Sequence, residues 1–453
     1  MKITRPPSKT EQQKSLQELS QSPAKLMKYL DLNSPVDSKG RYLSFDELQY
    51  RVEKSVDVTL VWPIVKQARQ KQLNPVVTLG IPPKKCKFFL TSTIQKAISE
   101  VDRHTTDAAL EWMCNKINER KYFDYLIENL IEDESISSSQ LEGAATTTKV
   151  AKNLLKMTRK PRTPDEKMIV GNFNMMKLAW TSRNENLSLD LIKELHIAGV
   201  QGIHDNKYYP GMIRNTDDIE IVDEMGETVY IPPPSEGLTK RLKDLVKWSN
   251  SQHDDIESRN FLHPLVKAIA LHFAIGYEHP FYDGNGRVAR SLFYWYLFKN
   301  EFAAFRYIAI SSYLKKAPAK YAKSYLYTET DDMDLTYFLD YQCSVIIRAV
   351  NTFRDTYKNR LKDIEKFDQW LFTSGLYKQL NEKERIVFHA AKNEYVTYLT
   401  VNELKESLNC SYNTAAKILN KLVDLKLFKK EKKGREWTFS MLDKKVILKN
   451  WNM

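Results

Sequence analysis

The 453-residue chain is 42% hydrophobic and 28% charged with a formal net charge of +12, which indicates a globular, multidomain protein rather than a disordered one. No stretch approaches the roughly twenty apolar residues that cross a bilayer, and the polar N-terminus does not resemble a signal peptide, so we expect no membrane partner. The four cysteines lack Cys-x-x-Cys spacing, which argues against a zinc site or a disulfide framework and favours a cytoplasmic protein.

Residues 1–125 are predicted to form a helical N-terminal extension. A polar tail is followed by Ser44-Phe-Asp-Glu47, a capping-box pattern that starts a helix. Amphipathic segments follow at residues 58–70 and 91–113. No residue pattern in this extension suggests a catalytic role.

Residues 126–160 contain the hexapeptide Ser138-Ser-Gln-Leu-Glu142-Gly143. Ser138 and Glu142 are four residues apart, so they share one face if the segment is helical. Serine-rich segments with a glutamate are also common helix starts, and the hexapeptide alone fits either interpretation.

Residues 161–366 are predicted to be mainly helical. Thr163-Pro-Asp-Glu166 has the cap and the first-turn proline of a helix start. Further helices are expected from Ser188, Asn260, Arg287 and Leu335. Three histidines on these helices have no metal-ligand partners at suitable spacing and are expected to be packed or capping residues: His196, His263 and His272.

A β-hairpin is predicted within this region, around a glycine-containing loop at residues 223–227. The apolar residues that alternate on its two strands are Ile219, Ile221, Val229 and Ile231. Pro210-Gly-Met-Ile-Arg214 precedes the hairpin, and three prolines at residues 232–234 follow it.

The densest group of chemically useful residues lies at 279–290, between two helical patterns. His279 is the side chain best suited to accept a proton near neutral pH, and Asp283 can hold a divalent cation through a hard oxygen ligand. Arg287 and Arg290 lie one turn apart on one helix face, where their forked donors can grip phosphates.

Glycines complete this segment, because Gly284 and Gly286 form a tight turn that opens the second helix. The unpaired N–H groups at such a helix start favour anions. The residues therefore predict a phosphate cradle with a base beside it.

His279-Pro-Phe-Tyr-Asp-Gly-Asn-Gly-Arg287, closed by Arg290, resembles the signature loop of Fic-domain proteins at every fixed position. The resemblance implies transfer of a nucleotidyl group, usually AMP from ATP, to a Ser, Thr or Tyr hydroxyl of a protein target, which can be the protein itself. Family members that phosphorylate carry a lysine where this chain has Gly286, which favours AMP transfer.

In this interpretation His279 is the general base and Asp283 places Mg²⁺ on the α- and β-phosphates. Pro280 stiffens the loop and Phe281 anchors it in the core. The residues expected to hold the phosphates are Gly284, Asn285, Gly286, Arg287 and Arg290. Glu278, where many relatives have an apolar residue, is expected to point away from the base.

Two other segments also resemble parts of Fic proteins. The motif Ser138, Glu142 and Gly143 resembles the inhibitory motif of the class with an N-terminal inhibitory helix, in which Glu142 would pair with Arg290 and occupy the γ-phosphate position. The hairpin at residues 219–231 resembles the flap, whose exposed edge can pair with an extended target segment. The alternative is a hairpin that only covers the core.

Residues 367–380 are predicted to be a linker and residues 381–453 a separate module. Helices are expected at 382–392, 400–408 and 411–425, with Thr400 and Ser411 as caps, followed by a basic hairpin from Lys429. This arrangement resembles a winged helix-turn-helix. Ile418, Leu419, Leu422 and Val423 are expected to face its core, and Asn413, Lys417, Asn420 and Lys421 to face outward. Residues 401–453 hold twelve Lys and Arg against six Asp and Glu, a charge that favours DNA, although many such modules bind only proteins.

The predicted fold is therefore mainly α, with a Fic-type helical catalytic core, a small β-hairpin flap and a C-terminal winged helix-turn-helix. The favoured function is an autoinhibited AMP-transferase. The alternatives are a nucleotide-sensing DNA-binding regulator, and a UMP transferase or a deAMPylase that uses the same site. The oligomeric state stays open, with a homodimer as one option.

Overall fold

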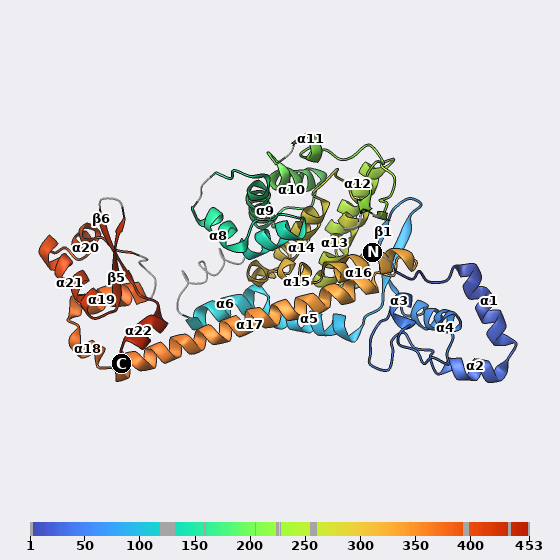
Figure 1. Cartoon of the computed structure of the whole chain (residues 1–453), viewed down its shortest axis with the longest axis horizontal. Helices are drawn as coiled ribbons and strands as arrows, with labels where there is room; N and C mark the ends of the chain where they lie inside the picture. The colour runs from blue at the N-terminus through green and yellow to red at the C-terminus, as the bar shows by residue number, and fades with distance from the viewer. Residues whose placement is uncertain are drawn as a thin grey trace. The chain divides into compact units, whose positions relative to one another are not determined.

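A computed structural model describes residues 3–117, 132–157, 160–203, 205–222, 226, 228–253, 261–392, 398–433 and 436–451 (Figure 1). The chain is mainly helical, as predicted, and its described strands form three two-stranded antiparallel hairpins. Two compact units are present. Met1–Asp107 and Asn129–Val350 form the first unit, and Ala108–Glu128 and Asn351–Met453 form the second.

The N-terminal part of the first unit packs around Trp62, which is fully buried and meets Phe45 edge to face. The predicted capping box is present, because Ser44 and Glu47 cap each other's backbone. The predicted segment 58–70 is one helix, whereas the segment 91–113 is interrupted at Thr105, the C-cap of its first helix. The elements are α1 (Lys9–Ser20), α2 (Pro23–Leu30), α3 (Phe45–Leu48), α4 (Val58–Gln70), β1 (Asn74–Leu79), β2 (Lys84–Phe88) and α5 (Ser92–His104). The next helix, α6 (Asp107–Ile117), belongs to the second unit from Ala108 on.

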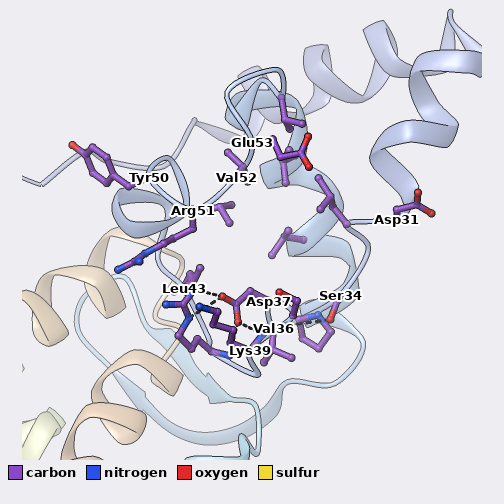
Figure 2. Close-up of a pocket in the computed structure, with 18 of the residues that line it drawn as sticks. Asp31, Ser34, Val36, Asp37, Lys39, Leu43, Tyr50, Arg51, Val52 and Glu53 are labelled. Atoms are coloured by element: carbon purple, nitrogen blue, oxygen red, sulfur yellow. Dashed lines mark hydrogen bonds and ion pairs between the residues drawn. The ribbon is translucent and has the colours of Figure 1, made fainter.

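A cavity of about 860 Å³ opens in this N-terminal part (Figure 2). Apolar and charged side chains both line it, and all of its lining residues lie between positions 28 and 69. One of them, Asp37, accepts hydrogen bonds through its carboxylate from the Arg41 side chain and from two backbone amides of the same turn. None of the residues at 279–290 lines this cavity.

Buried polar contacts fasten the N-terminal part to the rest of the first unit. Lys66 pairs with Asp331 at 2.8 Å, with both side chains almost fully buried. Tyr42 donates a hydrogen bond to Asp334, and Arg69 donates to the Tyr337 hydroxyl at 2.8 Å. Because an unpaired buried charge is costly, these contacts fix the orientation of α4 against the start of α17 (Thr336–Thr373).

Two helices, α13 (Pro264–Glu278) and α14 (Asn285–Lys299), form the centre of the first unit, and nearly all of their residues are buried. The predicted caps are present where Thr163 starts α9 and Ser188 starts α10. His263 caps α13, which begins at Pro264; the start predicted at Asn260 lies outside the described residues. The surrounding elements are α8 (Thr148–Met157), α9 (Pro164–Thr181), α10 (Leu189–Val200), α11 (Asp205–Tyr208), α12 (Leu238–Asn250), η1 (Ala303–Tyr307), α15 (Ser311–Leu314) and α16 (Pro318–Thr330).

The predicted hairpin is shorter than its apolar alternation suggested. Only β3 (Ile221–Val222) and β4 (Thr228–Tyr230) pair, with Ile221 opposite Tyr230 and an irregular register beside it. Ile219 and Ile231 therefore flank the ladder rather than extend it. The predicted loop at 223–227 lies outside the described residues except for Gly226.

The predicted linker at residues 367–380 is mostly helical: α17 continues as one helix to Thr373, and α18 (Leu376–Gln379) follows. Its amphipathic C-terminal turns bury Phe367 and Leu371 in the core of the second unit. The first unit ends at Val350, inside α17, rather than at the predicted residue 366.

The predicted C-terminal helices and hairpin are all present in the second unit. Thr400 and Ser411 cap their helices as expected, and the isolated bridge between Leu399 and Phe439 joins the first cap to the hairpin. The elements are α19 (Glu382–Lys392), α20 (Val401–Ser407), α21 (Tyr412–Asp424), β5 (Phe428–Lys433), β6 (Glu436–Met441) and α22 (Lys444–Trp451). In the described part of the chain, no helix combines the length and the apolar character that a membrane span requires.

We predict that Trp62→Ala lowers the free energy of unfolding of the N-terminal part by about 3–5 kcal/mol, because it leaves a large cavity among α1, α3 and α4. Chemical denaturation followed by circular dichroism measures this loss. Tyr50→Ala is the control, since Tyr50 is 77% exposed in the same region and its removal should change stability by less than about 0.5 kcal/mol. Equal effects of the two substitutions would contradict the prediction.

Candidate functional site

The loop between α13 and α14 is shaped by two residues in the left-handed backbone region. His279 ends α13 with φ of +48°, and Gly284 caps the start of α14 with φ of +82°. A Cβ at Gly284 would lie 2.9 Å from Val200 Cγ1, so both the backbone angle and the packing require glycine there. The loop is thus built to bring α14 close against α10.

Asn285 holds the loop closed from inside. Its side-chain oxygen accepts a hydrogen bond from the Phe281 N–H, and its side-chain nitrogen donates to the Phe281 carbonyl, both at 2.8 Å. The prediction that Asn285 holds phosphate is therefore corrected for its side chain, because both ends of the amide are engaged and the residue is buried. Its contribution is to fix the backbone that carries the cradle.

His196 supports the same loop from α10. Its ring stacks on the fully buried Phe281, the predicted loop anchor, with centroids 3.8 Å apart. Nδ1 accepts from the Gly211 N–H, so Nε2 carries the proton that it donates to the Asp283 carbonyl at 2.9 Å. Burial lowers the pKa of His196 to about 4, which keeps the ring neutral. The sequence predicted only a packed histidine here.

Among the described residues, the His279 ring has one hydrogen-bond partner, the Gly276 carbonyl. Its Nδ1 lies 3.2 Å from the Gly276 carbonyl, and a carbonyl can only accept, so Nδ1 carries the proton and Nε2 keeps its lone pair. Burial lowers the pKa of His279, which favours the neutral form. The ring is therefore prepared to accept a proton at Nε2.

Glu278 points away from this base, as expected. Its carboxylate accepts from the Gly80 N–H at 2.7 Å and pairs with Arg241 at 2.8 Å. The acid that departs from the usual apolar residue of the family thus ties the β1–β2 turn and α12 to the end of α13.

Both predicted phosphate-binding arginines are buried at the start of α14. Arg287 donates to the Gly199 carbonyl at 2.7 Å, while its buried Nε has no hydrogen-bond partner among the described residues. Arg290 donates to the Ser138 hydroxyl at 2.9 Å and to the Glu142 carboxylate at 2.8 Å. Two guanidinium groups and a helix N-terminus therefore converge where an anion is favoured.

Glu142 is the anion that lies in this position. The segment 132–141 is helical and ends at Gly143, whose φ is +96°. A Cβ at Gly286 would lie only 2.4 Å from Glu142 Oε1, so the carboxylate rests directly against the first turn of α14. The two motifs, 148 residues apart in sequence, meet through Arg290, Ser138 and Glu142.

Asp283 lies at the rim of the cradle. One carboxylate oxygen accepts from the Gly284 N–H at 2.6 Å, and the other pairs with Lys207 at 3.0 Å. The described residues contain no cluster of three or more His, Cys, Asp or Glu side chains around a common point. Mg²⁺ bound with a nucleotide needs only one or two carboxylates besides phosphate and water, so Asp283 fits that role, and the exposed Lys207 can give way.

The segment that precedes the hairpin lies beside the loop. Ile213 forms an isolated bridge with Phe281, and the Arg214 N–H donates to the Pro280 carbonyl at 2.9 Å. Of the four predicted hairpin residues, Ile219, Ile221 and Val229 are half-buried, and Ile231 is 65% exposed. The structure therefore brings the segment that leads into the hairpin against the loop that carries His279.

The segment that contains this loop is similar to a known protein family. Residues 186–297 match the model of the Fic/DOC family. These residues form a Fic domain. It holds α10, α13, most of α14 and the whole signature loop, whereas Ser138 and Glu142 precede it.

The relatives of the Fic domain are similar over a short stretch. A protein adenylyltransferase Fic from Nematostella vectensis is 34% identical over 110 residues, which are 24% of this chain and 22% of that protein. Protein adenylyltransferase fic-1 from Caenorhabditis elegans is 29% identical over 116 residues, 25% of this chain and 19% of that one. The chain thus spans about a fifth of the length of these relatives.

A solved structure of a Fic family protein from Desulfovibrio desulfuricans has 17% sequence identity and a TM-score of 0.49, covering 78% of this chain and 96% of that one.

We predict that Asn285→Ala weakens the loop by about 1–3 kcal/mol, because two buried backbone groups of Phe281 lose their partners. Calorimetry with ATP should then show affinity reduced roughly tenfold in a Glu142→Gly background, each tenfold being about 1.4 kcal/mol. Asn186→Ala, at an exposed position of the Fic domain, should leave affinity unchanged. Unchanged binding by Asn285→Ala would show that its side chain does not shape the cradle.

Proposed function

We propose that this protein transfers AMP from ATP to a hydroxyl of a protein target and that Glu142 inhibits the transfer. The observation that carries the proposal is a histidine with a free Nε2 beside an anion cradle that an internal carboxylate fills. The names of the relatives, protein adenylyltransferase, support the same reaction. A cytoplasmic location belongs to this proposal, since that compartment supplies ATP, Mg²⁺ and protein targets.

The chemistry follows from the positions of these side chains. His279 Nε2 takes the proton of the target hydroxyl as its oxygen attacks the α-phosphorus. The bond between that phosphorus and the bridging oxygen breaks, and pyrophosphate leaves. Arg287, Arg290 and the first amides of α14 stabilise the charge that develops on the phosphate oxygens.

Asp283 is the residue that would hold Mg²⁺ on the nucleotide. Held there, the ion would supply positive charge that stabilises the negative charge on the leaving pyrophosphate. Asp283 itself is held by the Gly284 N–H, so its position depends on the same turn that starts α14. His196 supports this turn through the Asp283 carbonyl.

Inhibition follows from competition for Arg290. This guanidinium is 1% exposed, so it requires an acceptor at all times. Breaking a buried pair without replacement costs about 3–5 kcal/mol. The γ-phosphate of ATP must therefore take the place of the Glu142 carboxylate, and while Glu142 remains, ATP is held with its α-phosphate out of line.

The target hydroxyl is expected to arrive along the flap. An extended segment can pair with the exposed edge of a two-stranded hairpin and present alternate side chains to the site. Val222 and Ile231 are 54% and 65% exposed there, which suits an apolar neighbour of the modified residue.

We predict that Glu142→Gly increases self-labelling by α-labelled ATP tenfold or more, where each tenfold corresponds to about 1.4 kcal/mol. Arg290 then binds the γ-phosphate instead of a carboxylate. Labelling at the wild-type level would contradict the role of Glu142 as inhibitor. A parallel series with α-labelled UTP separates AMP from UMP transfer, and release of label from modified protein by the wild type would indicate deAMPylation.

The control for this experiment is His279→Ala in the Glu142→Gly background. Loss of a general base lowers the rate by about 10²–10⁴-fold, whereas ATP affinity should remain, because the cradle does not include the imidazole. Labelling that survives this change would show that another group accepts the proton.

We propose duplex DNA as a second partner, bound through the second unit. Asn413, Lys417 and Asn420 are exposed on one face of α21, opposite the buried Ile418, Leu419 and Leu422. Lys430 of the hairpin donates to Asn420 at 3.2 Å, so the hairpin and α21 form one basic face. Lys421, expected to face outward, instead pairs with Glu384 at 2.8 Å. A helix with an adjoining basic hairpin suits the major groove and the phosphates beside it.

We predict that Lys417→Glu and Lys430→Glu each weaken binding of the full chain to a 30-base-pair duplex in fluorescence anisotropy. The slope of log affinity against log salt should decrease by about one for each phosphate that is no longer bound. Lys378→Glu, with the same charge change on α18 of the same unit, should have little effect. Equal effects of all three substitutions would show that binding depends only on net charge and not on this face. Absence of binding by the unmodified chain would contradict DNA as a partner.

A further inference from the structure

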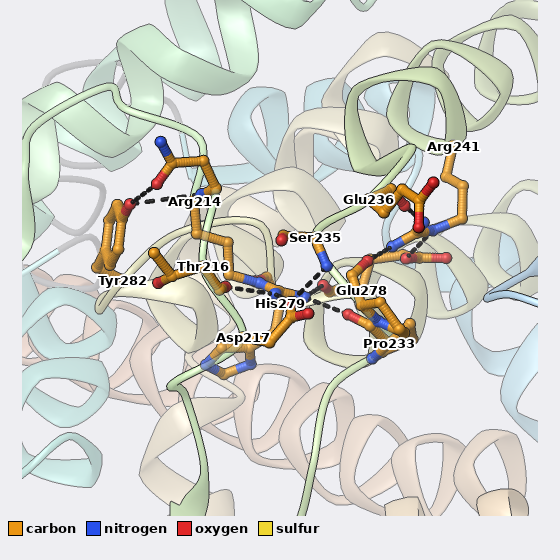
Figure 3. Close-up of polar contacts among 12 residues, drawn as sticks. Arg214, Thr216, Asp217, Pro233, Ser235, Glu236, Arg241, Glu278, His279 and Tyr282 are labelled. Carbon is orange, nitrogen blue, oxygen red and sulfur yellow. Dashed lines mark hydrogen bonds and ion pairs between the residues drawn. The ribbon is translucent and has the colours of Figure 1, made fainter.

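Arg214 occupies an unusual position between the base and the flap (Figure 3). It lies immediately before the flap in sequence and is 3% exposed. Its Nε donates to the His279 carbonyl at 2.8 Å, and its Nη2 donates to the Glu278 carbonyl at 3.3 Å. The guanidinium thus restrains the backbone at the C-terminal end of α13, where His279 carries the proposed base.

The same guanidinium reaches both ends of the flap. Nη1 donates to the Thr216 carbonyl at 3.1 Å and to the Asp217 carboxylate at 3.2 Å, where the chain enters the flap. Nη2 donates to the Pro233 carbonyl, where the chain leaves it. Asp217 closes the ring by accepting from the Ser235 N–H at 2.6 Å. One side chain therefore fixes the entry of the flap, its exit and the base.

The backbone of His279 needs such support. A non-glycine residue at φ of +48° is in a sparsely populated conformation, which costs of order 1–3 kcal/mol and persists only when its surroundings enforce it. The Arg214 side chain holds the carbonyl of His279, and the Arg214 N–H holds the next carbonyl, that of Pro280. Both contacts restrain the peptide units that orient the imidazole.

A second arginine supports the arrangement from α12. Arg241 pairs with the Glu278 carboxylate and donates to the Glu236 and Pro234 carbonyls, as Figure 3 shows. The buried Glu278 carboxylate balances the charge of Arg241. Asp217, the acid that pairs with Arg214, is largely exposed to solvent. Arg214 is therefore the cation whose charge and hydrogen bonds both act on His279.

We propose that Arg214 is a positioning residue that aligns the His279 base with the target strand on the flap. The proposal rests on the proposed AMP transfer. The Arg214 guanidinium donates to five acceptors around its planar fork, four backbone carbonyls and the Asp217 carboxylate. Lysine, with a single compact ammonium, cannot reach all five together. The flap and the base are thus set by one group, so a target that docks on the flap meets the imidazole at a fixed distance.

Charge gives the proposal a readout separate from folding. The charged groups that face His279 are Arg214 from the segment before the flap, Glu142 from the inhibitory helix and Asp283 from the loop. Burial lowers the pKa of His279 most, and the hydrogen bond to the Gly276 carbonyl raises it; among the charged groups, the Arg214 cation lowers this pKa and the two carboxylates raise it. Removal of the cation should raise the pKa of His279, which moves the acid limb of the rate profile to higher pH.

The test compares Arg214→Lys and Arg214→Gln in the Glu142→Gly background. At saturating ATP and target, Arg214→Lys should lower kcat about 10²-fold, the effect of a displacement near 1 Å, with ATP affinity by calorimetry unchanged. Arg214→Gln should also raise the pKa of His279, because it removes the cation that lowers this pKa, and NMR titration of the imidazole measures the change without any turnover. Arg183→Lys, whose guanidinium also binds a backbone carbonyl but lies away from the flap, is the matched control.

The outcomes separate this inference from the proposed function. If the Glu142→Gly variant with native Arg214 never labels a target, the result contradicts AMP transfer, whereas the NMR titration still tests the role of Arg214. Unchanged kcat in Arg214→Lys, or an unchanged imidazole pKa in Arg214→Gln, would overturn the positioning role. If neither variant folds, Asp217→Ala replaces them. This substitution removes the hydrogen bonds from Arg214 and Ser235 at an exposed position, so it should raise KM for the target and leave ATP affinity intact, and no change in KM would equally overturn the proposal.

Discussion

Two buried guanidinium groups, Arg287 and Arg290, lie with the unpaired amides at the start of α14, and this concentration of positive charge organises the site. A negative charge is favoured at such a helix start, and an unpaired buried cation is costly. Glu142 supplies the negative charge in this structure. In the proposed function the γ-phosphate takes the same place, so the proposed inhibitory contact and the proposed substrate contact meet one electrostatic requirement.

Rigidity around that helix start comes from neutral groups rather than from further charges. Asn285 closes the loop through backbone hydrogen bonds, and the neutral His196 stacks on Phe281 while it holds the Asp283 carbonyl. A charged residue in either place would compete with phosphate or with the arginines. The shape of the loop therefore does not depend on the Glu142 carboxylate.

The parts of the site that the sequence predicted are those in which function depends on local spacing. His279, Gly284 and Arg287 lie within nine positions of each other, and the helix start that joins them follows from glycine and capping rules. Pairing of Glu142 with Arg290 was expected from family resemblance, and the geometry agrees. The helices and caps of the second unit were also predicted closely, since Thr400 and Ser411 are strong local signals.

The contributions of Arg214, His196 and the Asn285 side chain could not be read from spacing, because each acts on backbone carbonyls or amides that side-chain patterns do not reveal. Residues 367–380, predicted as a linker, instead continue α17 to Thr373, because Phe367, Trp370 and Leu371 pack into the core of the second unit. Hydrogen bonds to the main chain therefore carry much of what distinguishes a positioned active site from a list of reactive residues. In this protein they converge on the carbonyls of Glu278, His279 and Pro280, where the flap and the base share one guanidinium.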